Sequence, residues 1–158
     1  MSNSLPLDRI LQLSGTDFNI AFYDYLTERK SQESAMSPIE EEAWLVLTLL
    51  LDIEMEGFID LFYQLYSLRD CDIVEDCLKK LGLQKLATQF AEAKFLYTGG
   101  RNGITEVDFR GIDPWIDTLA DETAAARFDA IGNEILAEGS EIYLVDRRVE
   151  IYVKECFG

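Results

Sequence analysis

The segment that most constrains the fold begins at Ser37 and continues to about Glu56. It opens with Ser37-Pro38-Ile39-Glu40, which supplies an N-cap hydroxyl, a proline at the first helical position and a glutamate that completes a capping box. The nine residues 43–51 are apolar apart from Thr48, so a helix through them is apolar nearly all round. We therefore predict one long helix, buried at the centre of the molecule.

Apolar residues recur at helical spacing on both sides of this segment. With the capping signals, they predict further helices. One is short and covers 5–13, and a second begins at a cap at Asp17 and ends at a loop over 31–37. The others cover 58–66, 72–81, 83–97, 121–136 and 140–157. Residues 98–111 hold several glycines and predict a loop, and Asp113-Pro114 a short helical turn. We expect an all-α, single compact domain of about seven to nine helices packed around Trp44–Leu51, with residues 1–36 as N-terminal helices and loop.

Acidic residues outnumber basic residues by 30 to 14, which gives a net charge of −16. A small domain needs only about 2–8 charges for solubility. The acids form two blocks: eleven lie between 40 and 76 against one base, and ten between 105 and 141 against two, while 77–104 holds five bases and one acid. Such a field repels nucleic acids and anionic membranes and attracts basic proteins. We expect a basic protein as partner, and neither direct nucleic-acid binding nor membrane binding.

Histidine is absent, which excludes catalytic triads, Cys–His pairs and imidazole bases. The three cysteines, Cys71, Cys77 and Cys156, lack the spacing of zinc ligands, and an odd number in a Cys-poor chain indicates reduced thiols. The glycine-rich segment 99–103 lacks the signature of a phosphate-binding loop. We therefore predict a protein that is not an enzyme and carries neither a cofactor nor a metal.

The first residues contain neither the basic region nor the apolar core of a secretion signal. The longest apolar run, 43–51, has nine residues, whereas a membrane-spanning helix needs about 20. Together with the reduced thiols, these features predict a cytoplasmic protein.

The stretch from Leu51 to Tyr63 combines an acidic helix, a break at Met55-Glu56-Gly57 and a phenylalanine-rich helix. It resembles the signature of the acidic DNA-mimic protein family, in which an Asn-Gly-Gly-Phe-like break stands at this place. The similarity continues in 76–82, 90–93, 127–131 and 149–153, and so spans roughly residues 40–157. The resemblance implies an all-helical dimer that imitates DNA with its surface carboxylates. It also implies a partner that binds DNA, such as a transcription factor or a nucleoid protein, which the chain inhibits or regulates.

The acids expected to contact this partner lie in the two acidic blocks. They are Asp52, Glu54, Glu56, Asp60, Asp72, Glu75, Asp76, Asp117, Asp121 and Glu122. Carboxylates four residues apart on a helix are separated by ~6 Å along the axis, which is close to two phosphate steps of about 3.4 Å on one DNA strand. The spacing therefore permits phosphate mimicry.

Two other classes of function remain open. An immunity or antitoxin-like protein would neutralise one basic toxin with the same acids. A small hydrolase would use carboxylates such as Asp52 and Glu56 with a divalent ion. The acidic blocks would have to meet in space for mimicry, a co-purifying toxin would indicate an immunity protein, and activity that depends on Mg²⁺ would indicate the hydrolase.

Overall fold

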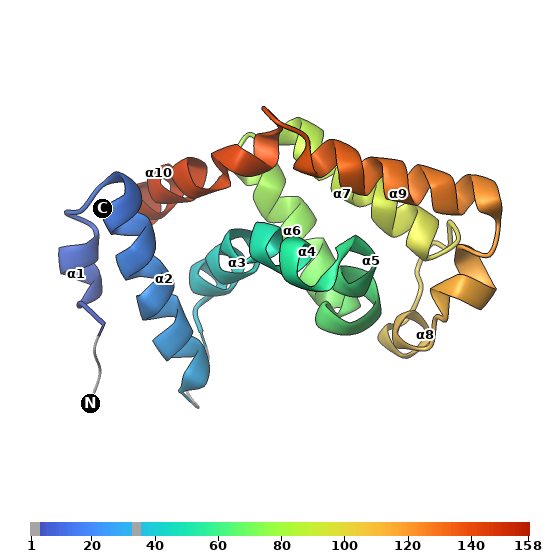
Figure 1. Cartoon of the computed structure of the whole chain (residues 1–158). Coiled ribbons are helices and arrows are strands. Elements are labelled where there is room, and N and C mark those ends of the chain that lie inside the picture. Colours follow the sequence, from blue (N-terminus) through green and yellow to red (C-terminus); the bar gives the residue numbers. More distant parts are fainter. Residues whose placement is uncertain (1–3, 33–35) are drawn as a thin grey trace.

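The computed structural model describes residues 4–32 and 36–158, and within these ranges the chain forms helices and no strand (Figure 1). Ten α-helices are found in the described ranges, seven of them with eight residues or more, so the predicted all-α fold is confirmed. None of the helices in this part of the chain is long and apolar enough to cross a membrane. In chain order the elements are α1 (Leu7–Ile10), α2 (Gly15–Ser31), α3 (Pro38–Leu47), α4 (Leu49–Glu56), α5 (Phe58–Asp60), the π-helical turn η1 (Leu61–Leu65), α6 (Leu68–Lys80), α7 (Gln84–Tyr97), α8 (Glu106–Arg110), the π-helical turn η2 (Pro114–Thr118), α9 (Glu122–Leu136), the 3-10 turn η3 (Glu141–Leu144) and α10 (Val145–Phe157).

The start of α3 has the capping box that its sequence predicts. The Glu40 amide donates to Ser37 Oγ at 3.2 Å, and the Ser37 amide donates to Glu40 Oε1 at 3.0 Å. Pro38 occupies the first helical position, where its missing N–H leaves no hydrogen bond unmade. The helix therefore begins at the predicted residue.

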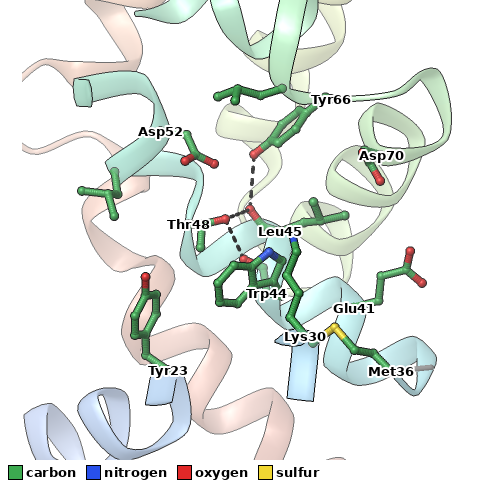
Figure 2. A pocket seen from close by; sticks show the side chains of 12 residues that line it. Tyr23, Lys30, Met36, Glu41, Trp44, Leu45, Thr48, Asp52, Tyr66 and Asp70 are labelled. Carbon is green, nitrogen blue, oxygen red and sulfur yellow. Dashed lines mark hydrogen bonds between the residues drawn. The ribbon is translucent and has the colours of Figure 1, made fainter. Parts of the chain in front are cut away.

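The predicted continuous helix over 38–56 is wrong at Thr48, where the chain divides into α3 and α4. The Thr48 hydroxyl donates to the Trp44 carbonyl at 2.8 Å (Figure 2). A threonine side chain that bonds one turn back competes with the backbone and bends a helix. Nor is the segment buried all round as predicted, because Leu51 is 46% exposed whereas Val46 and Leu49 are buried.

Gly57 ends α4 with a φ of 96°, a conformation that residues with a side chain rarely adopt. The next helix is short and finishes in the wider turn η1, in which the Tyr66 amide donates to the Leu61 carbonyl five residues back at 2.7 Å. Phe58 packs directly on Gly132 of α9, where a Cβ atom would lie 2.9 Å from Phe58 Cδ1. The glycine thus allows α5 to lie against α9.

The core between these helices is aromatic. The Phe62 ring lies 5.3 Å from that of Phe90, 5.4 Å from that of Tyr97 and 5.8 Å from that of Phe128, centroid to centroid. These residues join η1 to α7 and α9, and α7 pairs with α6 in a hairpin around Gly82 (Figure 1). This hairpin confirms the helices predicted over 72–81 and 83–97, except that α6 begins earlier, at Leu68, after a capping box formed by Ser67 and Asp70.

Other local predictions also differ from the structure. The helix predicted over 5–13 is shorter, Leu7–Ile10, and that predicted over 58–66 is α5 followed by the turn η1. The second helix begins at Gly15 and not after Asp17, because the Gly15 amide finds an acceptor in Glu150 Oε1 of α10 at 2.8 Å. The predicted loop 98–111 contains α8, which the Thr105 hydroxyl caps by accepting from the Asp108 amide at 3.1 Å. The loop predicted at 31–37 includes residues 33–35, which lie outside the described residues.

The three cysteines are free thiols. Cys71 and Cys77 are buried on the inner side of α6, whereas Cys156 near the end of α10 is exposed. Burial raises the pKa of Cys77 to about 12 and raises that of Cys71 still further above its ordinary value. The two core thiols therefore stay protonated at neutral pH.

Candidate partner-binding surface

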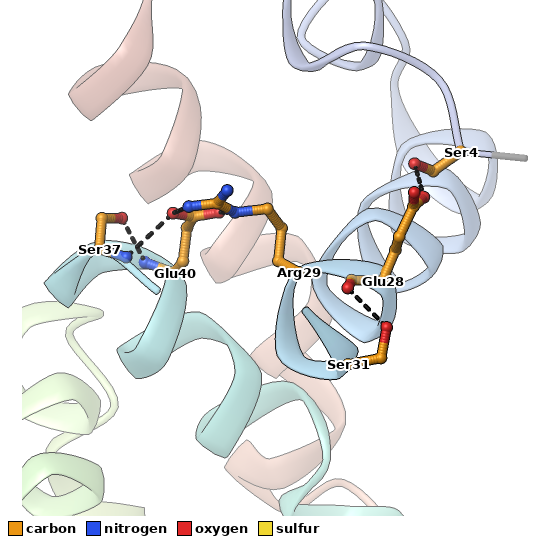
Figure 3. A network of polar contacts seen from close by, with 6 residues as sticks. All are labelled: Ser4, Glu28, Arg29, Ser31, Ser37 and Glu40. Carbon is orange, nitrogen blue, oxygen red and sulfur yellow. Dashed lines mark hydrogen bonds and ion pairs between the residues drawn. The ribbon is translucent and has the colours of Figure 1, made fainter. Parts of the chain in front are cut away.

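The three glutamates that open α3 are held in ion pairs with other elements. Glu40, which is 4% exposed, binds Arg29 of α2 through two hydrogen bonds of 2.9 and 3.2 Å (Figure 3). Glu41 pairs with Arg69 of α6, whose hydrogen bonds lower the pKa of that carboxyl. Glu42 pairs with Lys80 at the end of α6, at 2.6 Å. These acids join α3 to its neighbours and offer little charge to a partner.

Three other glutamates cap helices that are remote in sequence. Glu106 of α8 accepts from the Leu68 amide in the first turn of α6, and Glu141 of η3 accepts from the Leu86 amide in the first turn of α7, both at 2.8 Å. Glu150 of α10 likewise accepts from the Gly15 amide at the start of α2. Carboxylates at helix N-termini satisfy free N–H groups and the positive end of the helix dipole. Part of each acidic region is thus committed to the fold.

The acids of α4 and α5 are different. Glu54 and Glu56 are exposed, and Asp52 and Asp60 are partly buried. Within the described ranges, none of these four carboxylates takes part in an ion pair. Burial raises the pKa of Asp52, and the nearby Glu56 carboxylate adds to this effect. The negative charge of this segment is therefore not compensated.

The same holds for Asp117 of η2 and for Asp121 and Glu122 at the start of α9, which are exposed and make no ion pair among the residues described. Asp117 Oδ2 accepts from the Asp113 amide, and Asp121 caps α9 by accepting from the Ala124 amide, both at 2.9 Å. These hydrogen bonds orient the carboxylates without neutralising them. We refer to the seven residues Asp52, Glu54, Glu56, Asp60, Asp117, Asp121 and Glu122 as the unpaired acids.

An aromatic contact joins the two parts of this group. The Tyr63 ring of η1 lies 5.0 Å from the Trp115 ring of η2 in a T-shaped arrangement. Burial raises the pKa of Tyr97, and Asp113 and Asp60, one from each acidic block, add to this effect. The two blocks, which are about fifty residues apart in sequence, are thus joined through a contact between η1 and η2.

Two of the three predicted acids of α6 are paired with lysines of the same hairpin. Asp72 pairs with Lys94 of α7 at 2.5 Å, and Glu75 pairs with Lys79 one turn later at 3.2 Å. Asp76 is exposed, and no ion pair of it is found among the described residues. Since α6 packs against α7 and α3, these acids belong to the hairpin that carries most of the lysines. They remain candidates from the sequence, but the structure gives two of them a local cation.

Sequence reasoning missed a set of exposed apolar side chains among the unpaired acids. Met55 is 72% exposed, Trp115 55% and Ile116 73%, and Tyr63 is 41% exposed. Aromatic and methionine side chains are enriched at protein interfaces, and tryptophan and tyrosine frequently dominate the binding energy. The signal was present in the sequence: Trp115-Ile116 follows Asp113-Pro114, and Met55 has acids on both sides.

The carboxylates do not cluster in the manner of a metal centre. In the described parts of the chain, no group of three or more histidine, cysteine, aspartate or glutamate side chains is close enough to hold a metal ion. Asp52 and Glu56, the pair considered for a hydrolase, stand one helical turn apart on α4. The arrangement presents spread negative charge beside aromatic surface.

The sequence model of a family described as DMP19-like protein matches residues 34–156. This range begins before α3 and ends within α10, and it contains all of the unpaired acids. No curated protein and no solved structure matches the chain.

Proposed function

Since the chain belongs to the DMP19-like protein family, we propose that it is a DNA mimic, which binds a basic, DNA-binding protein through carboxylates in the places of DNA phosphates. One observation supports this above the others: within the described residues, the acids of α4 and α5 and those of η2 and α9 make no ion pair, and the segments η1 and η2, which adjoin them in sequence, touch through Tyr63 and Trp115.

The physical basis is electrostatic. A basic protein that binds DNA carries lysine and arginine side chains spaced for phosphates, and charge-assisted hydrogen bonds to carboxylates are equally available to them. The net charge of −16 steers such a protein toward the chain. Met55, Tyr63, Trp115 and Ile116 then supply apolar contact, so that binding is not purely a matter of charge.

The expected biological consequence is inhibition or regulation of the partner, because a surface occupied by the mimic is closed to DNA. The partner would be a transcription factor or a nucleoid protein. No catalytic step and no cofactor is required in this function.

The test uses a partner that is captured from a source lysate on the immobilised protein at low salt and then eluted from it at high salt. Labelled DNA is bound to the captured partner and then displaced with the wild-type chain. Two triple variants are compared with it: Glu54→Lys, Glu56→Lys and Asp60→Lys among the unpaired acids, and a matched control with Asp129→Lys, Glu138→Lys and Glu155→Lys. The three control residues are exposed acids, for which no ion pair is found within the described residues.

We expect the wild type and the control triple to displace DNA and the first triple to fail. Equal displacement by both triples would exclude this part of the surface. A partner that binds the wild type tightly but keeps its DNA would contradict mimicry and would instead favour an immunity or antitoxin-like protein.

A further inference from the structure

A pocket of about 530 Å³ opens beside the unpaired acids, between α2, the α3–α4 junction, η1 and the start of α6 (Figure 2). Three aromatic side chains contribute to its lining, namely Tyr23, Trp44 and Tyr66. Three carboxylates also contribute, namely Glu41, Asp52 and Asp70. A concave site that combines aromatic faces with carboxylates has the chemistry that recognises an organic cation.

A cation already occupies part of this site. The Lys30 ammonium lies over the Trp44 ring, 4.8 Å from its centroid. The Tyr23 ring stacks on Trp44 as well, with 5.6 Å between the two centroids. Figure 2 shows the Lys30 side chain extended into the pocket beside the indole. Because Lys30 is an exposed residue near the end of α2, its side chain is free to leave when another cation enters.

The three carboxylates of the pocket differ in how far other groups of the protein already occupy their oxygens. Glu41 is engaged by Arg69, and Asp70 Oδ2 accepts from the Ser67 amide at 3.0 Å to cap α6. Asp52 makes no ion pair within the described residues, and Lys30 influences it only at longer range. Its partial burial disfavours the ionised form. Asp52 is therefore the acid that would gain most from a cation inside the pocket.

We propose that this pocket receives the guanidinium group of one arginine of the basic partner, which stacks on Trp44 in the place of the Lys30 ammonium and pairs with Asp52. Arginine suits the site better than lysine, because its planar group stacks on an aromatic face and binds a carboxylate through two parallel hydrogen bonds. This inference rests on the proposed function for the source of the arginine. It adds one arginine side chain of the partner, bound inside the pocket, to an electrostatic contact that otherwise involves only surface carboxylates.

The pocket is tested with small probes, without the partner. Nα-acetyl-arginine amide is titrated into the labelled full-length chain, and heteronuclear NMR follows the indole N–H of Trp44, with that of Trp115 as the reporter of non-specific binding. Nα-acetyl-citrulline amide is the neutral isostere, and Nα-acetyl-lysine amide is the second cation. We expect the arginine probe to shift Trp44 in a saturable way, the lysine probe to bind more weakly and the citrulline probe to have no effect.

Two variants and a control locate the binding. Asp52→Asn should weaken the arginine probe about tenfold, through the loss of a charge-assisted hydrogen bond. Lys30→Ala should strengthen it roughly two- to fivefold, because the internal competitor for the Trp44 face is removed. Asp129→Asn, an exposed acid on α9 outside the pocket, should leave it unchanged.

Four outcomes would each overturn the assignment. The arginine probe leaves the Trp44 indole resonance unshifted, the citrulline probe shifts it equally, the lysine probe binds more tightly than the arginine probe, or Lys30→Ala leaves the affinity for the arginine probe unchanged. These outcomes are independent of the DNA-displacement experiment, whose variants lie at Glu54, Glu56 and Asp60 and line no part of this pocket. If DNA is displaced but the probe does not bind, the mimic works without the pocket. If the probe binds but DNA is not displaced, the pocket recognises arginine and the proposed function fails.

Discussion

The glutamates that open α3 and the acids of α4 and α5 belong to one acidic block, yet they have opposite environments. Each of Glu40, Glu41 and Glu42 has an arginine or lysine partner from another helix. Glu54 and Glu56, a few turns later in the chain, are exposed, and the described residues supply them with no such partner. Charge that looks uniform along the sequence is divided in space into acids that hold the fold and acids that are available to a partner.

This division shows why net charge alone is a poor measure of a binding surface. The capping glutamates Glu106, Glu141 and Glu150 count toward −16, but their oxygens are occupied by backbone amides. Fewer acids are therefore available for recognition than the composition suggests. Mutations in the two groups should therefore have separable effects.

The largest effect on stability should come from Glu40→Ala. This change leaves Arg29 without its carboxylate and removes half of the capping box, so we expect the free energy of unfolding to fall by about 2–3 kcal/mol, somewhat less than for a fully buried pair. Urea unfolding followed by circular dichroism measures it, with Glu54→Ala as the matched change among the unpaired acids. Similar losses of stability for Glu40→Ala and Glu54→Ala would show that the ion-paired and the unpaired acids do not differ in their contribution to folding.

A smaller loss is expected from Glu106→Ala, which removes the acceptor of the Leu68 amide in α6. Loss of a helix cap typically costs about 1 kcal/mol. Amide exchange of Leu68 should accelerate together with this loss, while exchange at the start of α7, which Glu141 caps, should stay as in the wild type. An unchanged Leu68 amide would mean that water replaces the carboxylate without cost.

The pH dependence should have opposite signs in the two groups. The pKa of Asp52 is raised by burial, so the free energy of unfolding falls as the pH rises above the ordinary value of 3.8, and the loss is complete above the raised pKa. Asp52→Asn should therefore be slightly more stable than the wild type at pH 7, and the difference should vanish below the ordinary aspartate value of 3.8. Glu41, whose pKa is lowered, contributes stability above its ordinary value of 4.5, and Glu41→Gln should lose it there. Urea titrations at a series of pH values would show both trends, and a destabilised Asp52→Asn at pH 7 would contradict the first.

The smallest effect on stability should come from neutralising Glu54, Glu56 and Asp60 together as Gln, Gln and Asn. Glu54 and Glu56 are exposed, Asp60 is partly buried, and none of the three makes an ion pair within the described residues. Surface acids of this kind contribute little to stability, so we expect a change within about 0.5 kcal/mol. Binding of the captured partner should nevertheless lose part of its salt dependence, measured as the slope of affinity against ionic strength. A large loss of stability would assign these acids to the fold after all.

Much of the fold was accessible from sequence because its signals are local. The Ser37–Glu40 capping box, the cap at Asp121 and the turn after Asp113 depend on residues within one helical turn, and all three were predicted. The start of α2 was missed because its acceptor, Glu150, is 135 residues away. The break at Thr48 was missed because the apolar pattern around it gives no sign of the hydroxyl's bond to Trp44.

The candidate surface was predicted less completely for the same reason. Which acids lack a cation depends on contacts between helices, such as Glu42 with Lys80, and no spacing rule predicts these. Sequence reasoning therefore included Asp72 and Glu75 with the unpaired acids and left out Trp115. The pocket beside Trp44 arises from segments 23–70 and becomes visible only when α2 and α6 are in place.

The unequal burial of the three cysteines offers a practical route into these questions. A thiol-reactive fluorophore should attach to Cys156 alone, since the two sulfurs on α6 are protonated and enclosed. The unmodified chain thus accepts one dye per molecule, on a helix that carries none of the unpaired acids. Modification of Cys71 and Cys77 would require α6 to open, so the rate at which these two thiols react on a longer timescale measures local unfolding in the native protein.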